Sequence, residues 1–123
     1  MEINEITGQT ITCAMKVHSV LGPGLLESAY QGCLAYELHR AGLKVDAQVT
    51  LPLVYENIKI DAGYRLDLRV ADRVVVEVKS VERILPIHKA QLLSYLRLSG
   101  LHVGLLINFN VIHLTEGIKR MIL

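Results

Sequence analysis

The residues that decide the fold are Tyr64–Lys79, with the sequence YRLDLRVADRVVVEVK. Polar and apolar side chains alternate over 64–70, and valines dominate 74–79, which predicts two β-strands. Only the three residues Ala71–Arg73 separate the two segments, so the strands are expected to form an antiparallel hairpin. The remaining elements are expected to pack around this hairpin.

Matching the apolar faces of the two strands predicts their register. Leu66 and Leu68 are expected on one face, with Leu68 opposite Val76. A slip of one residue would turn every side chain to the other face. This register places Asp67 opposite Glu77, and two like charges facing each other are destabilising unless something offsets them. A divalent cation would do so, although the spacing alone favours a solvated sheet face crossed by ion pairs.

The side chains around this pair have the chemistry of a site for a hard cation. The carboxylates of Asp67 and Glu77 suit Mg²⁺ or Mn²⁺, and the backbone carbonyl of Val78 would be available as a third ligand. Lys79 projects from the same face as Glu77, about two strand rises away, or roughly 7 Å. There its ammonium group would hold an attacking water or offset negative charge in a transition state.

Hydrophobic periodicity predicts the elements on either side of the hairpin. Apolar residues recur at helical spacing in three segments, which are 3–20, 25–41 and 87–99. The first helix is expected to stop at Gly22-Pro23-Gly24. Further strands are predicted at 45–53, 58–60 and 101–109, and 118–123 is either a last edge strand or a short tail element.

Length and composition predict one globular domain over residues 1–123. Hydrophobic residues make up 51% of the chain and charged residues 20%, which excludes intrinsic disorder. The net charge of +1 excludes a global basic field of the kind that points to nucleic acid. The mean hydropathy of +0.36 is high for a small chain, so an apolar patch buried in a homo-oligomer is expected.

The sequence shows no targeting or membrane signal. The start Met1–Glu5 is acidic and lacks an apolar core, so no signal peptide is expected. The longest uncharged stretch, Leu98–Thr115, holds too many polar residues for a bilayer span. Cys13 and Cys33 are expected to be free and mostly buried thiols. A cytoplasmic location without a membrane partner follows as the default.

Polar residues on the predicted helices form a second group of candidates. Gln91 and Tyr95 are four residues apart in the third helix, and His88 lies one turn earlier on the same stripe. Such a stripe can be plain solvent exposure, or it can be a rim of donors for a nucleic-acid backbone. Glu27 lies in the first turn of the second helix, where the helix dipole alone is a sufficient reason for an acid.

A resemblance to a known family covers nearly the whole chain. The segment Gly24–Tyr30, GLLESAY, is similar to the signature of the small bacterial GxxExxY proteins, a family placed in the PD-(D/E)xK nuclease superfamily. Further matching blocks are 17–24, 64–67, 76–82, 91–96 and 104–109. Each block is short, but together they are specific.

The resemblance implies roles for particular residues. Asp67 matches the first metal-binding Asp of the superfamily, with a leucine where the superfamily name has Pro. Glu77-Val78-Lys79 matches the (D/E)xK element. Gln91 and Tyr95 are similar to the QxxxY helix of RecB-like and lambda-exonuclease-like nucleases. Glu27 resembles the acidic residue that the superfamily often places on its first core helix.

The resemblance also implies a fold and an activity. The fold is a restriction-endonuclease-like α/β core, with a central mixed β-sheet flanked by α-helices. The activity is that of a nuclease that uses Mg²⁺ or Mn²⁺ to hydrolyse phosphodiester bonds of DNA or RNA. The candidate catalytic side chains are Asp67, Glu77, Lys79 and Glu27, and the candidate substrate-binding ones are Gln91, Tyr95 and His88. Whether the protein is an enzyme stays open at this point. A catalytically inactive module that binds nucleic acid or protein, and an oligomeric scaffold, are the alternatives.

Overall fold

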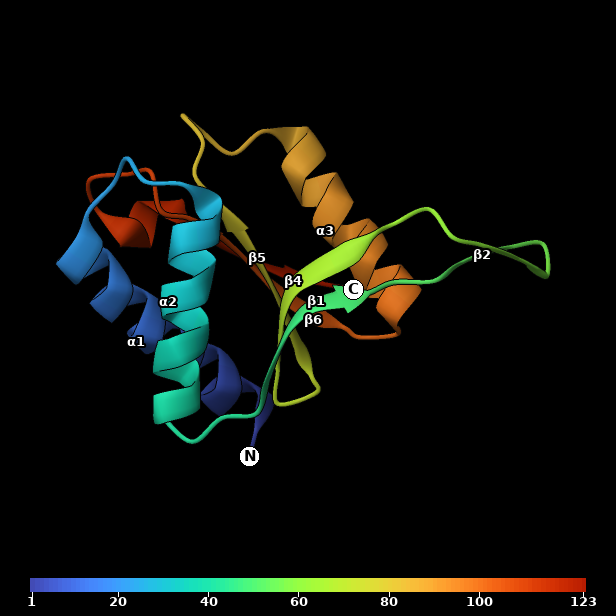
Figure 1. The fold of residues 1–123 in the computed structure, drawn as a ribbon, viewed down its shortest axis with the longest axis horizontal. Coiled ribbons are helices and arrows are strands. Elements are labelled where there is room, and N and C mark those ends of the chain that lie inside the picture. The colour runs from blue at the N-terminus through green and yellow to red at the C-terminus, as the bar shows by residue number, and fades with distance from the viewer.

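A central mixed sheet organises the protein, as a computed structural model covering residues 1–123 shows. Five strands lie in the order β1-β4-β5-β6-β7, and helices cover the sheet (Figure 1). The elements are α1 (Ile3–Leu21), α2 (Glu27–Arg40), β1 (Val45–Thr50), β2 (Leu53–Tyr55), β3 (Ile58–Ile60), β4 (Arg65–Val70), β5 (Val74–Lys79), α3 (Pro86–Ser99), β6 (Val103–Asn108), the 3₁₀ turn η1 (Leu114–Gly117) and β7 (Ile118–Ile122). The predicted α/β class is confirmed.

The strand pairing follows the register predicted for the hairpin. β4 and β5 pair antiparallel, with Leu68 opposite Val76 and Val70 opposite Val74. β5 and β6 pair parallel, and the other neighbours in the sheet are antiparallel. Two parallel strands need a long crossover connection, and α3 forms most of the connection between β5 and β6.

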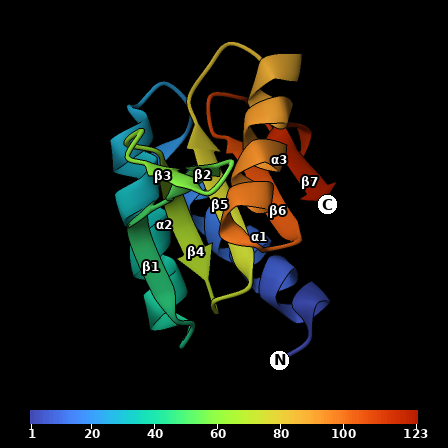
Figure 2. The ribbon, with the colours of Figure 1, turned by 90° about the vertical axis from the view of Figure 1, so that its right-hand side faces the viewer.

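The two faces of the sheet are covered unequally. Figure 2 shows α3 in front of the sheet and α1 and α2 behind it. The face under α1 and α2 holds a core of 17 buried residues, whereas the face under α3 holds a core of 7. Gly104 lets α3 lie close to β6, because a Cβ atom at this position would come within 2.9 Å of the Leu92 side chain. The α3 face is therefore the thinner and more open layer.

The strands β1 and β4 turn their apolar residues from one face to the other partway along. Leu68 packs in the larger core, but Leu66 packs in the smaller one, so the prediction that both share a face is wrong. In the neighbouring strand β1, Gln48 adopts a left-handed φ of +53°. The register of β1 and β4 puts Gln48 at the level of Asp67. The change of face therefore occurs at the predicted site residue.

The predicted strand over 45–53 is broken in two. β1 ends at Thr50, and the chain resumes as β2 after Pro52, which lacks the N–H needed for a continuous ladder. β2 and β3 form a separate two-stranded sheet, joined by Glu56 and Asn57 with φ of +46° and +69°. Figure 1 shows this hairpin extending away from the body of the protein.

The structure settles two smaller expectations. No helix has both the length and the apolar character that crossing a membrane requires. Both cysteines are free, but only Cys13 is buried, and Cys33 is exposed, so the prediction of buried thiols holds for one of the two.

Candidate functional site

The structure brings Asp67 and Glu77 together where the ladder between β4 and β5 ends. The last backbone pair of this ladder is Leu68 with Val76, one step before the carboxylates. The Asp67 N–H donates to Glu77 Oε1 at 3.2 Å, and the Val78 N–H donates to Asp67 Oδ2 at 2.8 Å. Each carboxylate therefore accepts a hydrogen bond from the backbone of the opposite strand. The two acids are adjacent, as the matched apolar faces predict.

The environment of Glu77 makes its ionised form costly. Its residue surface is only 4% exposed, and burial raises the pKa of the carboxyl to about 8, with the charge of Asp67 adding to the rise. Lys79 acts in the opposite direction but does not cancel the effect. A buried carboxylate beside a second one needs a proton or a cation to offset the charge. The pair is therefore suited to receive a cation.

The backbone of Val78 adds an oxygen on the same side. Its N–H points toward β4, since it donates to Asp67. Within a strand the N–H and the C=O of one residue point to the same side, as the exchange of both bonds within one antiparallel pair requires. The Val78 carbonyl therefore also faces β4, where the ladder has ended beside the two acids.

The side chains of α3 connect to this strand through Lys79. The Lys79 ammonium donates to Gln91 Oε1 at 3.3 Å. Tyr95, one helical turn further on, is largely buried, and burial raises the pKa of its phenol, with the charges of Glu77 and Asp67 adding to the rise. The predicted polar stripe of α3 therefore faces the two acids rather than open solvent.

His88 has a structural partner in addition to its predicted place on the stripe. Its Nδ1 accepts a hydrogen bond from the Leu85 N–H at 3.0 Å, at the N-terminus of α3. A neutral ring that accepts at Nδ1 carries its proton at Nε2. The ring also lines the cleft beside α3, so it has one nitrogen for the helix end and one N–H for a ligand.

Glu27 lies beside the end of β5 but apart from the two acids. Its Oε2 accepts a hydrogen bond from the Ser80 N–H at 3.2 Å, and the Ser80 hydroxyl donates to the Leu25 carbonyl at 2.6 Å. No three His, Cys, Asp or Glu side chains lie close enough together to hold a metal ion. The geometry gives Glu27 the task of holding the chain directly after Lys79.

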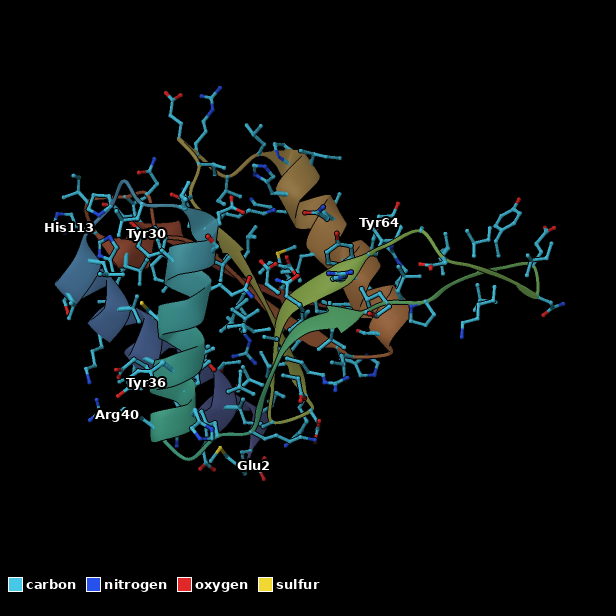
Figure 3. All side chains as sticks on the ribbon, in the orientation of Figure 1. Glu2, Tyr30, Tyr36, Arg40, Tyr64 and His113 are labelled. Carbon is cyan, nitrogen blue, oxygen red and sulfur yellow. The ribbon has the colours of Figure 1, made fainter.

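Tyr30 was not assigned a role by sequence reasoning, although it closes the GLLESAY segment. It is fully buried and stacks on Phe109 with ring centroids 4.6 Å apart. Its hydroxyl donates to the Gly22 carbonyl at 2.5 Å and accepts from the Leu25 N–H at 3.1 Å. Figure 3 shows Tyr30 at the start of α2, next to the loop from α1. It therefore fixes the loop that binds Ser80.

Asn108 is the second residue that sequence reasoning missed. It is buried at the end of β6, its Oδ1 accepts from the Val81 N–H at 3.0 Å, and its Nδ2 donates to the Val81 carbonyl at 2.9 Å. Lys79 pairs with Asn108 in the sheet. A buried amide at the end of a strand is a signal that would have drawn attention to it.

A cleft of about 740 Å³ opens between α3 and the base of the β2–β3 hairpin. All three predicted substrate-binding side chains line it, namely His88, Gln91 and Tyr95. Lys79, Tyr64 and Arg97 line it as well. The Tyr64 ring lies 6.0 Å from that of Tyr95. No acidic side chain lines the cleft. The cleft is therefore positively charged, and Lys79, two residues after Glu77 on β5, forms part of its wall.

Comparison with known proteins identifies the family. The family model of the PD-(D/E)XK nuclease superfamily matches residues 4–121, and the chain belongs to this superfamily. No curated protein matches the chain, and no solved structure matches it. The predicted resemblance is confirmed for the superfamily, while the narrower likeness to GxxExxY proteins stays a prediction.

Proposed function

We propose that the protein is a metal-dependent nuclease that hydrolyses phosphodiester bonds of DNA or RNA. The observation that carries this proposal is the carboxylate pair of Asp67 and Glu77, of which Glu77 is buried, on the strand whose Lys79 lines a cleft with cations and no acids. Membership of a nuclease superfamily supports a nucleic-acid substrate and hydrolysis. Family membership does not specify the residues that hold the metal or the ion itself, and we propose Asp67 and Glu77 with Mg²⁺ or Mn²⁺.

The donor atoms around the pair fit such an ion. Asp67, Glu77 and the Val78 carbonyl would hold it, and all three offer hard oxygen atoms, which Mg²⁺ and Mn²⁺ prefer. The high pKa of the Glu77 carboxyl supports the assignment, because a bound cation would offset the negative charge that burial makes costly. When bound, the ion supplies Lewis-acid polarisation of the phosphodiester and lowers the pKa of water.

The neighbouring side chains would position the reacting groups. The Lys79 ammonium, held by Gln91, would orient the attacking water or offset the charge that develops on the phosphate. The Tyr95 phenol stays protonated, because burial and the two acids raise its pKa, so it can donate a hydrogen bond to a phosphate oxygen. Glu27 and Tyr30 would act indirectly, by fixing the chain next to Lys79.

Cleavage of DNA and RNA oligonucleotides in Mn²⁺ tests the proposal. Single strands and duplexes are incubated with the wild type, with Asp67→Asn and with Asp72→Asn. Asp72 is the matched control, since it lies in the turn of the same hairpin and is bonded to Lys44. We expect cleavage by the wild type and by Asp72→Asn but not by Asp67→Asn. A wild type that cuts none of these substrates would contradict the proposal and favour the inactive binding module.

The expectations of a cytoplasmic location and of a homo-oligomer accompany this proposal as predictions. Exposed apolar side chains such as Val20 on α1 and Leu26 directly before α2 support the second of these. Sedimentation of the purified protein tests it directly. A single species with the mass of one chain would contradict the expected oligomer.

A further inference from the structure

We infer that the cleft between α3 and the β2–β3 hairpin takes a single-stranded nucleic acid, with a base stacked on Tyr64. The inference deepens the proposed function and rests on it for the position of the scissile phosphate. It concerns the part of the substrate that lies beyond the two acids. Stacking of bases on aromatic side chains, combined with a cationic groove, is a general means of holding single strands.

Lys79 and Tyr95 connect the cleft with the acid pair. Lys79 belongs to both, because it follows Glu77 on β5 and lines the cleft with its side chain. Tyr95 also lines the cleft, and it is close enough to Glu77 for the carboxylate charge to raise its pKa. A chain lying in the cleft would therefore reach the acids at one end.

The walls of the cleft suit bases better than a duplex. Half of its lining residues are hydrophobic, among them Leu53, Ile87 and Leu98. A duplex presents phosphates on its outside and keeps its bases stacked inside, so apolar walls would gain little from it. A single strand presents unstacked bases, which such walls can cover, while Lys79 and Arg97 meet its phosphates.

Tyr64 is the aromatic ring best placed for a base. It is 42% exposed, whereas Tyr95 is 9% exposed. The two rings are tilted by 52° with centroids 6.0 Å apart, so Tyr95 supports Tyr64 from the helix side. Figure 3 shows Tyr64 where β4 approaches α3, at the base of the hairpin.

The small net charge of the chain also favours a single strand over a duplex. Proteins that bind duplexes through the backbone neutralise many phosphates with Lys and Arg. This chain has a net charge of only +1, and its cleft contains two permanent cations, Lys79 and Arg97. Affinity must therefore depend on contacts with bases to a greater extent than on a broad electrostatic field.

The first experiment measures fluorescence anisotropy in EDTA, where no cleavage occurs. The probes are labelled 12-nucleotide single strands of DNA and of RNA, the matching DNA duplex, and a DNA strand of the same length made of abasic sites. We expect both intact single strands to bind more tightly than the duplex and than the abasic strand. An abasic strand or a duplex that binds as tightly as the intact single strand would overturn the inference.

The second experiment locates the stacking on Tyr64. Tyr64→Leu keeps an apolar side chain but removes the ring, and we expect it to weaken binding of the intact strand by roughly 5- to 150-fold. Tyr64→Phe keeps the ring and should bind like the wild type. Tyr36→Leu is the control, because Tyr36 is 60% exposed on α2, away from the cleft. Equal affinity of Tyr64→Leu and the wild type would overturn the inference.

These results separate the inference from the proposed function. A protein that binds single strands through Tyr64 but cuts nothing in Mn²⁺ would support the inference and contradict nuclease activity. A protein that cuts duplexes in Mn²⁺ but shows no preference for single strands would keep the nuclease proposal and overturn the inference.

Discussion

The two ends of the β4–β5 hairpin differ although the same two strands form both. At the turn end, Val70 faces Val74 with regular pairing, and both side chains are fully buried. At the other end, Asp67 and Glu77 face each other, and their carboxylates bond to backbone N–H groups across the strands. The regular ladder ends at the pair of Leu68 with Val76, directly before the two acids.

The difference shows how favourable packing and a costly charged group divide within one hairpin. The turn end contributes buried apolar area and hydrogen bonds, which hold the sheet together. The acid end places a carboxylate in an apolar environment, which raises its pKa to about 8 and costs stability whenever it ionises without a partner. The well-packed turn end therefore fixes the position of the acid end.

The largest effect on stability is expected at the turn end. Leu68 belongs to the regular ladder that runs to the turn, where it pairs with Val76, and it is fully buried in the larger core. Leu68→Ala removes its packing and leaves a cavity, so the free energy of unfolding should fall by about 2–5 kcal/mol. Urea unfolding measures this change. A fall of less than about 1 kcal/mol would mean that the turn end is not the stabilising part.

Lys79→Ala should affect the rate rather than the stability. Loss of one electrostatic contact in the transition state typically lowers kcat by about 10²–10³, with a much smaller change in KM. Lys44→Ala is the control, because Lys44 bonds Asp72 at the turn end, and it should leave kcat unchanged. Cleavage rates and thermal midpoints are measured together. A folded Lys79→Ala variant that cuts at the wild-type rate would remove Lys79 from the mechanism.

Glu77→Gln should abolish a pH dependence of stability in the metal-free protein. The pKa of Glu77 rises from 4.5 to about 8 on folding, so between these values the folded state binds more protons than the unfolded state. Stability contributed by this group is therefore present at low pH and is lost as pH rises toward 8, by up to about 1.4 kcal/mol per pH unit.

Urea unfolding of the two proteins in EDTA, from pH 5 to pH 9, measures the difference between them. The variant lacks the titrating group, so its stability relative to the wild type should increase with pH through this window. If the difference between the two proteins is the same at pH 5 and pH 8, the assignment of the raised pKa to Glu77 is wrong.

Tyr30→Phe should lower the free energy of unfolding less than Leu68→Ala does. It keeps the stacking on Phe109 but removes the hydroxyl that bonds the Gly22 carbonyl and the Leu25 N–H. The expected loss is about 0.5–1.5 kcal/mol. Faster hydrogen exchange of the Ser80 amide, which bonds Glu27, would show that the loop has loosened. Unchanged exchange there would mean that Tyr30 does not support the end of β5.

Much of the hairpin and its acid pair could be predicted, because both depend on local alternation. The period of two between Leu68 and Val70 determines which residues face Val76 and Val74, and Asp67 then meets Glu77 without further information. The helices were predictable for the same reason, since apolar spacing and Gly22 mark the limits of α1.

Other features depend on contacts that no local pattern reveals. The change of face between Leu66 and Leu68 lies at the level of a left-handed φ at Gln48, a residue type that gives no signal for it. The bond from the Ser80 N–H to Glu27 joins residues 53 positions apart. Tertiary packing determines both, so the contact of Glu27 with the chain after β5 became visible only in the structure.

The most direct test of the central claim is a calorimetric titration with Mn²⁺ at pH 7, repeated in buffers of different ionisation enthalpy. We expect the wild type to bind Mn²⁺ and to release about one proton per ion, because Glu77 is largely protonated below its pKa of about 8 and must lose its proton to bind a cation. Asp72→Asn should behave identically, and Asp67→Asn should bind far more weakly. Equal binding by Asp67→Asn and the wild type, or binding without proton release, would contradict the claim that these two carboxylates form a metal site.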